Sequence, residues 1–221
     1  EELYCNSGYT LLALVVQRVS GQRFAAFMKQ RVFEPLGMQH THVHDDYGTL
    51  TPGRASSYNR GREGWRGVAL SYSNVGATSV FTTVDDLALW DRNFDDARVG
   101  GPAVQKAMLQ RGRLNSGREI DYASGLALAN FRGQPVIEHG GVDAGFRAHV
   151  LRLPRQRLTV LLLGNASDIN SGQLTRRAAE AALGDQLPPE AEPTTPTEVA
   201  LAAKSLQPFV GAFEMRPGFV L

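Results

Sequence analysis

The chain has 221 residues, of which 43% are hydrophobic, and its 23 basic and 22 acidic side chains give a net charge of +1. This composition is typical of a globular protein, and it gives no electrostatic support for a nucleic-acid partner or for binding to a membrane surface. No apolar run approaches the ~20 residues that span a bilayer, and the single cysteine, Cys5, excludes an internal disulfide.

The N-terminal part of the chain is predicted to be helical. Apolar residues at helical spacing predict a buried helix over residues 7–20. Asn6 or Ser7 is the expected N-cap, and Gly21 is expected to stop the helix. A second, amphipathic helix is expected over residues 24–33.

A long polar segment follows these helices. Residues 39–67 are rich in Gly, Arg and Ser, and we expect a surface excursion that lines a cleft. Residues 75–81 are expected to form a short strand. Thr83 is expected to cap a helix that ends by Gly100, and Pro102 is expected to open another helix through Met108.

The hydrophobic period changes from helical to alternating after residue 121. The pattern predicts four consecutive strands with short turns, over 122–131, 135–139, 146–153 and 158–163. The continuous apolar run at 160–163 favours a central strand covered on both faces. An amphipathic helix is expected over 168–183. The predicted fold class is α+β, an antiparallel sheet flanked by helices.

Composition divides the chain into three parts. Residues 1–184 carry the sheet and most helices, residues 185–205 read as a proline-rich linker, and residues 206–221 read as the truncated start of a C-terminal β domain. The chain begins in the middle of a pattern, so we expect that residue 1 is not the natural start and that the fold is truncated at its N-terminus.

Two stretches contain residues suited to catalysis. The run 138–145 places His139 beside three glycines between two predicted strands, although a plain hairpin turn with a chance histidine is the alternative. Tyr4 and Asn6 stand at the start of the first helix, where a phenol can move a proton and a carboxamide can hold a substrate amide. A second Tyr-x-Asn at 72–74 shows how easily this short motif arises by chance.

The order of several short motifs carries more information than any one of them. They are Tyr4-Cys5-Asn6-Ser7-Gly8-Tyr9, Phe33-Glu34-Pro35-Leu36-Gly37-Met38, Thr82-Thr83-Val84-Asp85-Asp86-Leu87, Tyr122 through Gly125-Leu126, His139-Gly140-Gly141 and Leu163-Gly164-Asn165. In this order, residues 3–183 resemble the serine β-lactamase and penicillin-binding-protein superfamily, and most closely its class C-related esterases and D-aminopeptidases.

The resemblance implies a β-lactamase/transpeptidase-like fold and roles for six residues. Tyr4 would be the general base, and Asn6 would bind the substrate's amide or acyl oxygen. His139, Gly140 and Gly141 would occupy the family's third motif, on a strand along the cleft. The backbone N–H of Val142 would form half of the oxyanion hole. The resemblance implies no metal and no cofactor.

This sequence departs from the family pattern in two respects. None of its three lysines stands three residues after a serine, so the nucleophilic Ser-x-x-Lys is missing. We expect that motif upstream of residue 1 and expect the 221-residue chain alone to be inactive. Histidine stands at 139 where penicillin-recognising members carry lysine, which favours ester or small-peptide hydrolysis over β-lactam hydrolysis.

The functional expectation is therefore the C-terminal portion of a metal-free serine hydrolase. Its partner would be a small acyl, peptide or β-lactam substrate. A non-catalytic homologue that serves as a binding module is the alternative, and a free-standing interaction domain is a third. The resemblance implies export to the periplasm or cell surface, and the sequence gives no oligomeric state.

The remaining histidines also admit a functional interpretation. His40, His42 and His44 alternate, so on a strand they would share a face and could bind Zn²⁺. The alternative is a polar loop, and it agrees with the resemblance. His149 lies within a predicted strand and is expected to be a packed or edge side chain.

Overall fold

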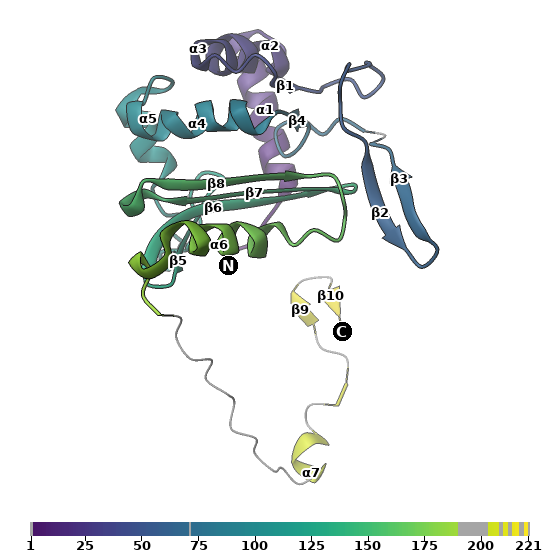
Figure 1. Cartoon of the computed structure of the whole chain (residues 1–221), viewed down its shortest axis with the longest axis vertical. Coiled ribbons are helices and arrows are strands. Elements are labelled where there is room, and N and C mark those ends of the chain that lie inside the picture. The colour runs from purple at the N-terminus through teal and green to yellow at the C-terminus, as the bar shows by residue number, and fades with distance from the viewer. Residues whose placement is uncertain are drawn as a thin grey trace. The chain divides into compact units, whose positions relative to one another are not determined.

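The computed structural model describes residues 2–70, 72–189, 203–207, 210–211, 214–216 and 219–220 (Figure 1). The chain divides into two compact units, Glu1–Pro189 and Glu190–Leu221. Among the described residues the α-helices are α1 Asn6–Ser20, α2 Phe24–Met28, α3 Glu34–Leu36, α4 Val84–Asp96, α5 Gly101–Met108, α6 Ser171–Leu183 and α7 Ala203–Leu206. The strands are β1 His42–Val43, β2 Ser57–Gly61, β3 Gly64–Val68, β4 Val80–Phe81, β5 Ala127–Phe131, β6 Gln134–Asp143, β7 Phe146–Leu153, β8 Leu158–Gly164, β9 Glu214–Arg216 and β10 Phe219–Val220.

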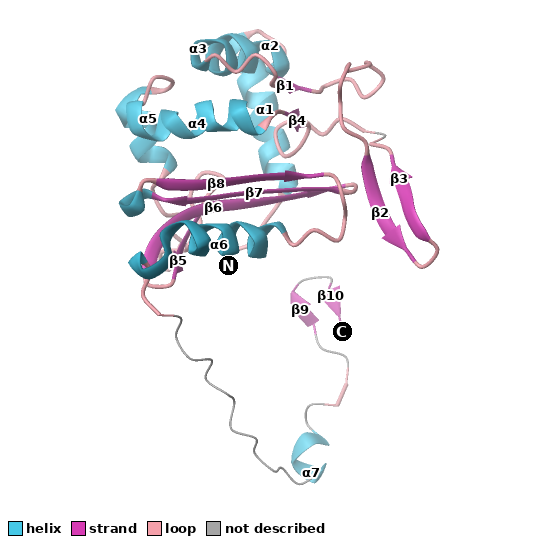
Figure 2. Ribbon diagram, in the orientation of Figure 1, coloured by secondary structure: helices cyan, strands magenta, loops and turns pink. Residues whose placement is uncertain are grey.

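The centre of the larger unit is a four-stranded antiparallel sheet in the order β5-β6-β7-β8. It lies among helices, with α6 and α4 contacting β8 (Figure 2). The α+β prediction is therefore confirmed, and so are the four consecutive strands. One detail was wrong: β8 is an edge strand of this sheet, and its Leu163 is partly exposed. A continuous apolar run reports hydrophobic surroundings but not the number of neighbouring strands.

The main hydrophobic core lies between one face of this sheet and α6. Alternate residues of each strand point to the same face, so β6 and β7 each supply every second side chain to this core. The buried members of the core are Phe131, Val136, Leu151, Leu153, Ala179, Leu183 and Leu187. A second cluster joins the segment after α2 to α4, with Phe33, Leu36, Met38 and Val43 buried in it.

Helix α1 matches the prediction in extent but not in burial. Gly21 ends it in the left-handed conformation, as expected, whereas Cys5 and not Asn6 or Ser7 occupies the N-cap. Ala13 is the helix's buried residue. Its leucines and valines are largely exposed, because no described element covers that side of the helix. Helical periodicity identifies an apolar face without identifying what packs against it.

Several other predicted boundaries changed. The helix predicted over 24–33 divides into α2 and a π-helical segment, Lys29–Phe33, before α3 ends at Gly37. The strand predicted over 75–81 shortens to β4. The polar excursion at 39–67 contains a β2–β3 hairpin, which we missed because its strands lack apolar alternation.

The smaller unit is described only in part. It contains α7 and an antiparallel pair formed by β9 and β10. Most of the linker predicted at 185–205 lies outside the described residues. Residues 208–209, 212–213, 217–218 and 221 of the C-terminal β domain predicted at 206–221 also lie outside them. The three-part domain division stays a prediction. Among the residues that the structure describes, no helix combines the length and hydrophobicity needed to cross a membrane.

Candidate active site

A cleft of about 1660 Å³ lies against the end of β6 and the start of α1. It is lined by all six residues to which the sequence assigned a role: Tyr4, Asn6, His139, Gly140, Gly141 and Val142. The two motifs are more than 130 positions apart in the chain, so their convergence on one cleft is a property of the fold. The structure thus brings the predicted residues together, while their individual roles stay predictions.

The pairing of β6 explains why its second half lies open to the cleft. The last β5–β6 pair joins Ala127 to Glu138, whereas β6 pairs with β7 through to Asp143. Within the described sheet, residues 139–143 therefore have a strand neighbour on one side only. A strand edge of this kind presents backbone N–H and C=O groups to whatever lies beside it. This agrees with a role of the Val142 N–H as a donor to substrate.

Three aromatic rings, those of Tyr4, Tyr122 and His139, lie close together, and two of them line the cleft. The Tyr4 ring centroid lies 6.1 Å from that of Tyr122 and 6.4 Å from that of His139. The Tyr122 hydroxyl lies 3.0 Å from His139 Nε2, within hydrogen-bond distance. Burial, together with the nearby phenols of Tyr9 and Tyr4, raises the pKa of Tyr122 above its ordinary value. Tyr122 therefore stays protonated at neutral pH and can hold the His139 ring, but it is a poor base.

Tyr4 differs from Tyr122 in its exposure, since 62% of it is open to solvent. It is thus the phenol that an incoming substrate can reach. We missed Tyr122 as a site residue because its partner is 17 positions away in the chain. The signal available in the sequence was its place in one of the motifs that carry the family resemblance.

The second Tyr-x-Asn, at residues 72–74, which we interpreted as a chance occurrence, makes hydrogen bonds to both β6 and α1, the two elements that carry the site motifs. Tyr72 donates a hydrogen bond to the carboxylate of Asp143, the last residue of β6. The side-chain oxygen of Asn74 accepts a hydrogen bond of 2.7 Å from Thr10 on α1. These contacts explain its position beside the cleft without giving it a chemical role.

The alternating histidines are engaged in packing and backbone contacts. The His42 ring stacks on Phe81 with centroids 5.7 Å apart, and the His44 ring lies edge-on to Phe81 at 5.1 Å. The backbone N–H of His40 donates to Asp86. Among the described residues, no three His, Cys, Asp or Glu side chains are grouped to hold a metal ion.

The fold is α+β, an antiparallel sheet among helices with a cleft beside the half of β6 that has no β5 partner. Comparison with known proteins identifies the family to which this fold belongs. Residues 1–184 match the family model described as Beta-lactamase, and the chain belongs to this family. The family resemblance noted in the sequence is therefore confirmed.

Individual relatives agree with this assignment. A D-aminopeptidase of Gluconobacter oxydans is 24% identical over 225 residues, covering 96% of this chain and 42% of the relative. The octameric penicillin-binding protein homologue from Pyrococcus abyssi superposes with a TM-score of 0.74 at 22% identity, covering 83% of this chain and 43% of that one. D-amino acid amidase from Ochrobactrum anthropi SV3 superposes with a TM-score of 0.71 at 17% identity, covering 84% and 60%. These likenesses show the fold, and the chain spans about half the length of the curated relatives it matches.

Proposed function

We propose that this chain is the C-terminal part of a serine hydrolase that cleaves amide, small-peptide or ester bonds through an acyl-enzyme. The observation that carries the proposal is the convergence of Tyr4, Asn6 and the residues 139–142 on one cleft. The relatives named D-aminopeptidase and D-amino acid amidase support an amide or peptide bond at a D-amino acid as the substrate class.

The cleft residues divide the chemistry between them. Tyr4 accepts the proton of the attacking serine hydroxyl and later returns it to the leaving group. Asn6 offers a donor and an acceptor to the substrate amide. The Val142 N–H donates to the oxyanion that develops on the carbonyl oxygen, where a preorganised donor stabilises the transition state more than the substrate. His139, held by Tyr122, orients the acyl portion of the substrate.

The nucleophile is proposed to lie outside these 221 residues. The absence of a Ser-x-x-Lys from the sequence supports this, as does the span of about half the length of the curated relatives. The exposed leucines and valines of α1 support a further element packed on that side, because a monomer rarely leaves a large apolar face in water. Export to the periplasm or cell surface is part of the same proposal.

His139 supports hydrolysis of esters and small peptides over that of β-lactams. An imidazole attracts a substrate carboxylate less than the charged ammonium of a lysine does. We therefore expect D-amino-acid amides to be turned over faster than penicillins by the complete protein.

The test uses the product of the complete coding sequence, treated with a fluorophosphonate probe and with a D-amino-acid amide. We expect covalent labelling of one serine, with kcat lowered at least about a hundredfold by Tyr4→Phe. Tyr47→Phe, an exposed tyrosine that does not line the cleft, is the matched control and should leave turnover unchanged. A protein that binds the amide but forms no acyl adduct is a binding module, and the proposal then fails.

A further inference from the structure

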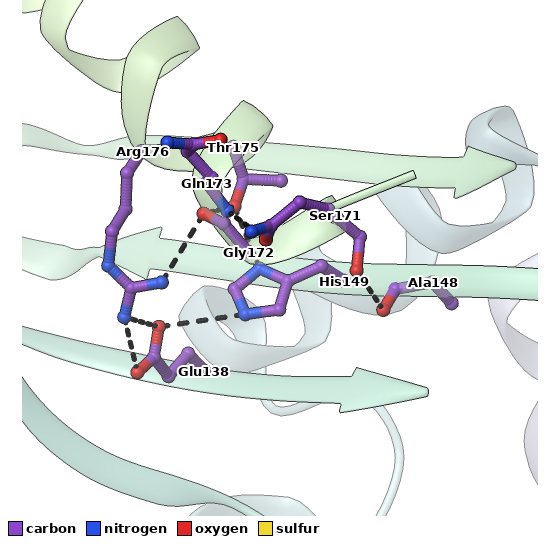
Figure 3. Close-up of polar contacts among 9 residues, drawn as sticks. Glu138, Ala148, His149, Ser171, Gly172, Gln173, Thr175 and Arg176 are labelled. Carbon is purple, nitrogen blue, oxygen red and sulfur yellow. Dashed lines mark hydrogen bonds and ion pairs between the residues drawn. The ribbon is translucent and has the colours of Figure 1, made fainter. Parts of the chain in front are cut away.

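A second polar cluster lies between β6, β7 and α6, on the face of the sheet away from the His139 ring (Figure 3). An Arg176 nitrogen donates to both carboxylate oxygens of Glu138, at 2.8 and 2.7 Å. His149 Nε2 lies 3.7 Å from a Glu138 oxygen, and His149 Nδ1 lies 2.8 Å from the hydroxyl of Thr175. The exposed fractions of the His149 and Glu138 side chains are 9% and 14%, so the cluster is largely removed from water.

This cluster is joined directly to the strand that carries His139. Glu138 precedes His139 in β6, and Gly140, which follows it, pairs with His149 across the sheet. A Cβ placed on Gly140 would lie 3.5 Å from Cδ2 of His149, and one on Gly172 of α6 would lie 3.7 Å from its Nε2. The imidazole is thus held between two glycine backbones, one on each element. It supports the cleft strand from behind.

The hydroxyl of Thr175 couples this support to proton positions. It has a single proton and two acceptors, the carbonyl oxygen of Gly172 at 3.0 Å and His149 Nδ1 at 2.8 Å. If the proton goes to the carbonyl, His149 must carry its own proton on Nδ1. If it goes to Nδ1, the imidazole proton sits on Nε2 and points toward Glu138. The two arrangements differ in the contact that His149 makes with β6.

Carboxylate, imidazole and hydroxyl here follow the order of a hydrolase triad, but the hydroxyl is no nucleophile. Thr175 is fully buried, with 0% of its surface exposed, and it lies on the opposite side of the sheet from the His139 ring. No substrate can reach it. The cluster's effect must therefore pass through the strand.

We propose that His149 is a positioning residue for the cleft strand, and that the Thr175 hydroxyl fixes its ring so that Glu138, His139 and Gly140 keep their places. The effect expected on catalytic rate rests on the proposed function, whereas the effect expected on the NMR spectra of His139 and His149 does not. The ligand-facing half of β6 has no β5 partner, so support from the back face carries more weight there than in a fully paired strand.

Burial favours the neutral form of His149. Burial lowers its pKa; Glu138 opposes this, and Arg176 on α6 and His139 on β6 add to the lowering. Because the folded-state pKa is depressed, the contribution of the neutral ring to stability is present above the ordinary pKa of about 6.5. That contribution is lost as the pH falls through the folded-state value.

The experiment compares three variants of the complete protein. Thr175→Val removes the hydroxyl at nearly constant volume, Thr175→Ser restores it, and Arg177→Gln is the control on the exposed side of the same helix. Long-range ¹H–¹⁵N NMR spectra report the tautomer and the titration of His139 and His149, with or without turnover. The kcat/KM profile against pH is measured in parallel with a D-amino-acid amide.

We expect Thr175→Val to change the His149 tautomer and to shift the His139 ring resonances. We also expect kcat to fall roughly tenfold or more with KM little changed, because small displacements of a site strand are costly to rate. Thr175→Ser should restore both. If Thr175→Val does not fold, Glu138→Gln, which keeps the shape, should shift the same resonances. The proposal is overturned if the tested variant, Thr175→Val or Glu138→Gln, gives the same His139 resonances and the same pH profile as the Arg177→Gln control. Shifted resonances in a protein without turnover uphold it and refute the hydrolase instead.

Discussion

Asp86 is predicted to be the main polar anchor of the segment that forms one wall of the cleft. It is 3% exposed, and its Oδ2 accepts from the backbone N–H of His40 at 2.7 Å and from the hydroxyl of Thr41 at 2.6 Å. Asp86→Ala leaves both donors without this acceptor. A buried donor without a partner costs about 1–3 kcal/mol. The Thr41 hydroxyl can still use Thr82, 2.7 Å away, and His40 is an exposed residue whose N–H can turn to water, so we expect a loss of about 1–2 kcal/mol.

The assay is urea unfolding followed by circular dichroism, with Asp85 as the matched site. Asp85 lies in the same first helical turn but is exposed, so Asp85→Asn should change the free energy of unfolding by no more than about 0.5 kcal/mol. Asp86→Asn keeps one acceptor oxygen and should lose about half as much as Asp86→Ala. The hydrogen-bond argument is refuted if Asp86→Ala costs no more than Asp85→Ala. It is also refuted if Asp86→Asn is as damaging as Asp86→Ala, because the charge and not the acceptor would then matter.

Three further outcomes follow from contacts around the cleft. Gly145→Ala would place a Cβ 2.6 Å from backbone atoms of β2, so it should lower the free energy of unfolding by about 1–3 kcal/mol. The control is Gly8→Ala on α1, where the new Cβ has open space and should not be destabilising. Arg152→Met removes the guanidinium that lies 2.8 Å from a carboxylate on α4, and should cost about 3 kcal/mol in the same unfolding assay while the exposed Arg155→Met is neutral. Burial raises the pKa of Tyr122, so the protonated phenol stabilises the folded protein below the ordinary pKa of about 10. This stabilisation is lost as the pH rises above that value. The free energy of unfolding should therefore fall less steeply with alkaline pH in Tyr122→Phe than in the unmutated protein.

The sequence predicted those parts of the fold that depend on neighbouring residues. The Thr83 cap is one example: its hydroxyl accepts from the N–H of Asp86, as the local pattern indicated. The same pattern could not show that the Asp86 side chain turns inward to a segment 46 positions away. Likewise, the four strands follow from their alternation, whereas the edge position of β8 depends on which strands lie beside it.

The sequence predicted that the site residues share one cleft, but it did not predict the contacts that hold them there. Motif order placed Tyr4 and His139 in one cleft, because a family resemblance carries spatial information that composition and periodicity lack. The partner of His139, Tyr122, and the support of β6 by His149 arise from pairing across the sheet and packing of α6. Neither contact has a local signature, so a histidine within a strand could be assigned only to packing.

The two glycines of the cleft strand show why register matters to interpreting a motif. The resemblance assigns both Gly140 and Gly141 to the motif on the strand along the cleft. Adjacent residues of a strand point to opposite faces, however. A Cβ on Gly140 would point toward His149, on the face that packs against α6. A Cβ on Gly141 would point to the other face and lie 3.4 Å from the Cβ of Ala148. Only Gly141 shares a face with His139, although both glycines line the cleft. A Cβ on Gly140 would instead contact the imidazole of His149, so the two glycines of the short motif face opposite sides of the sheet.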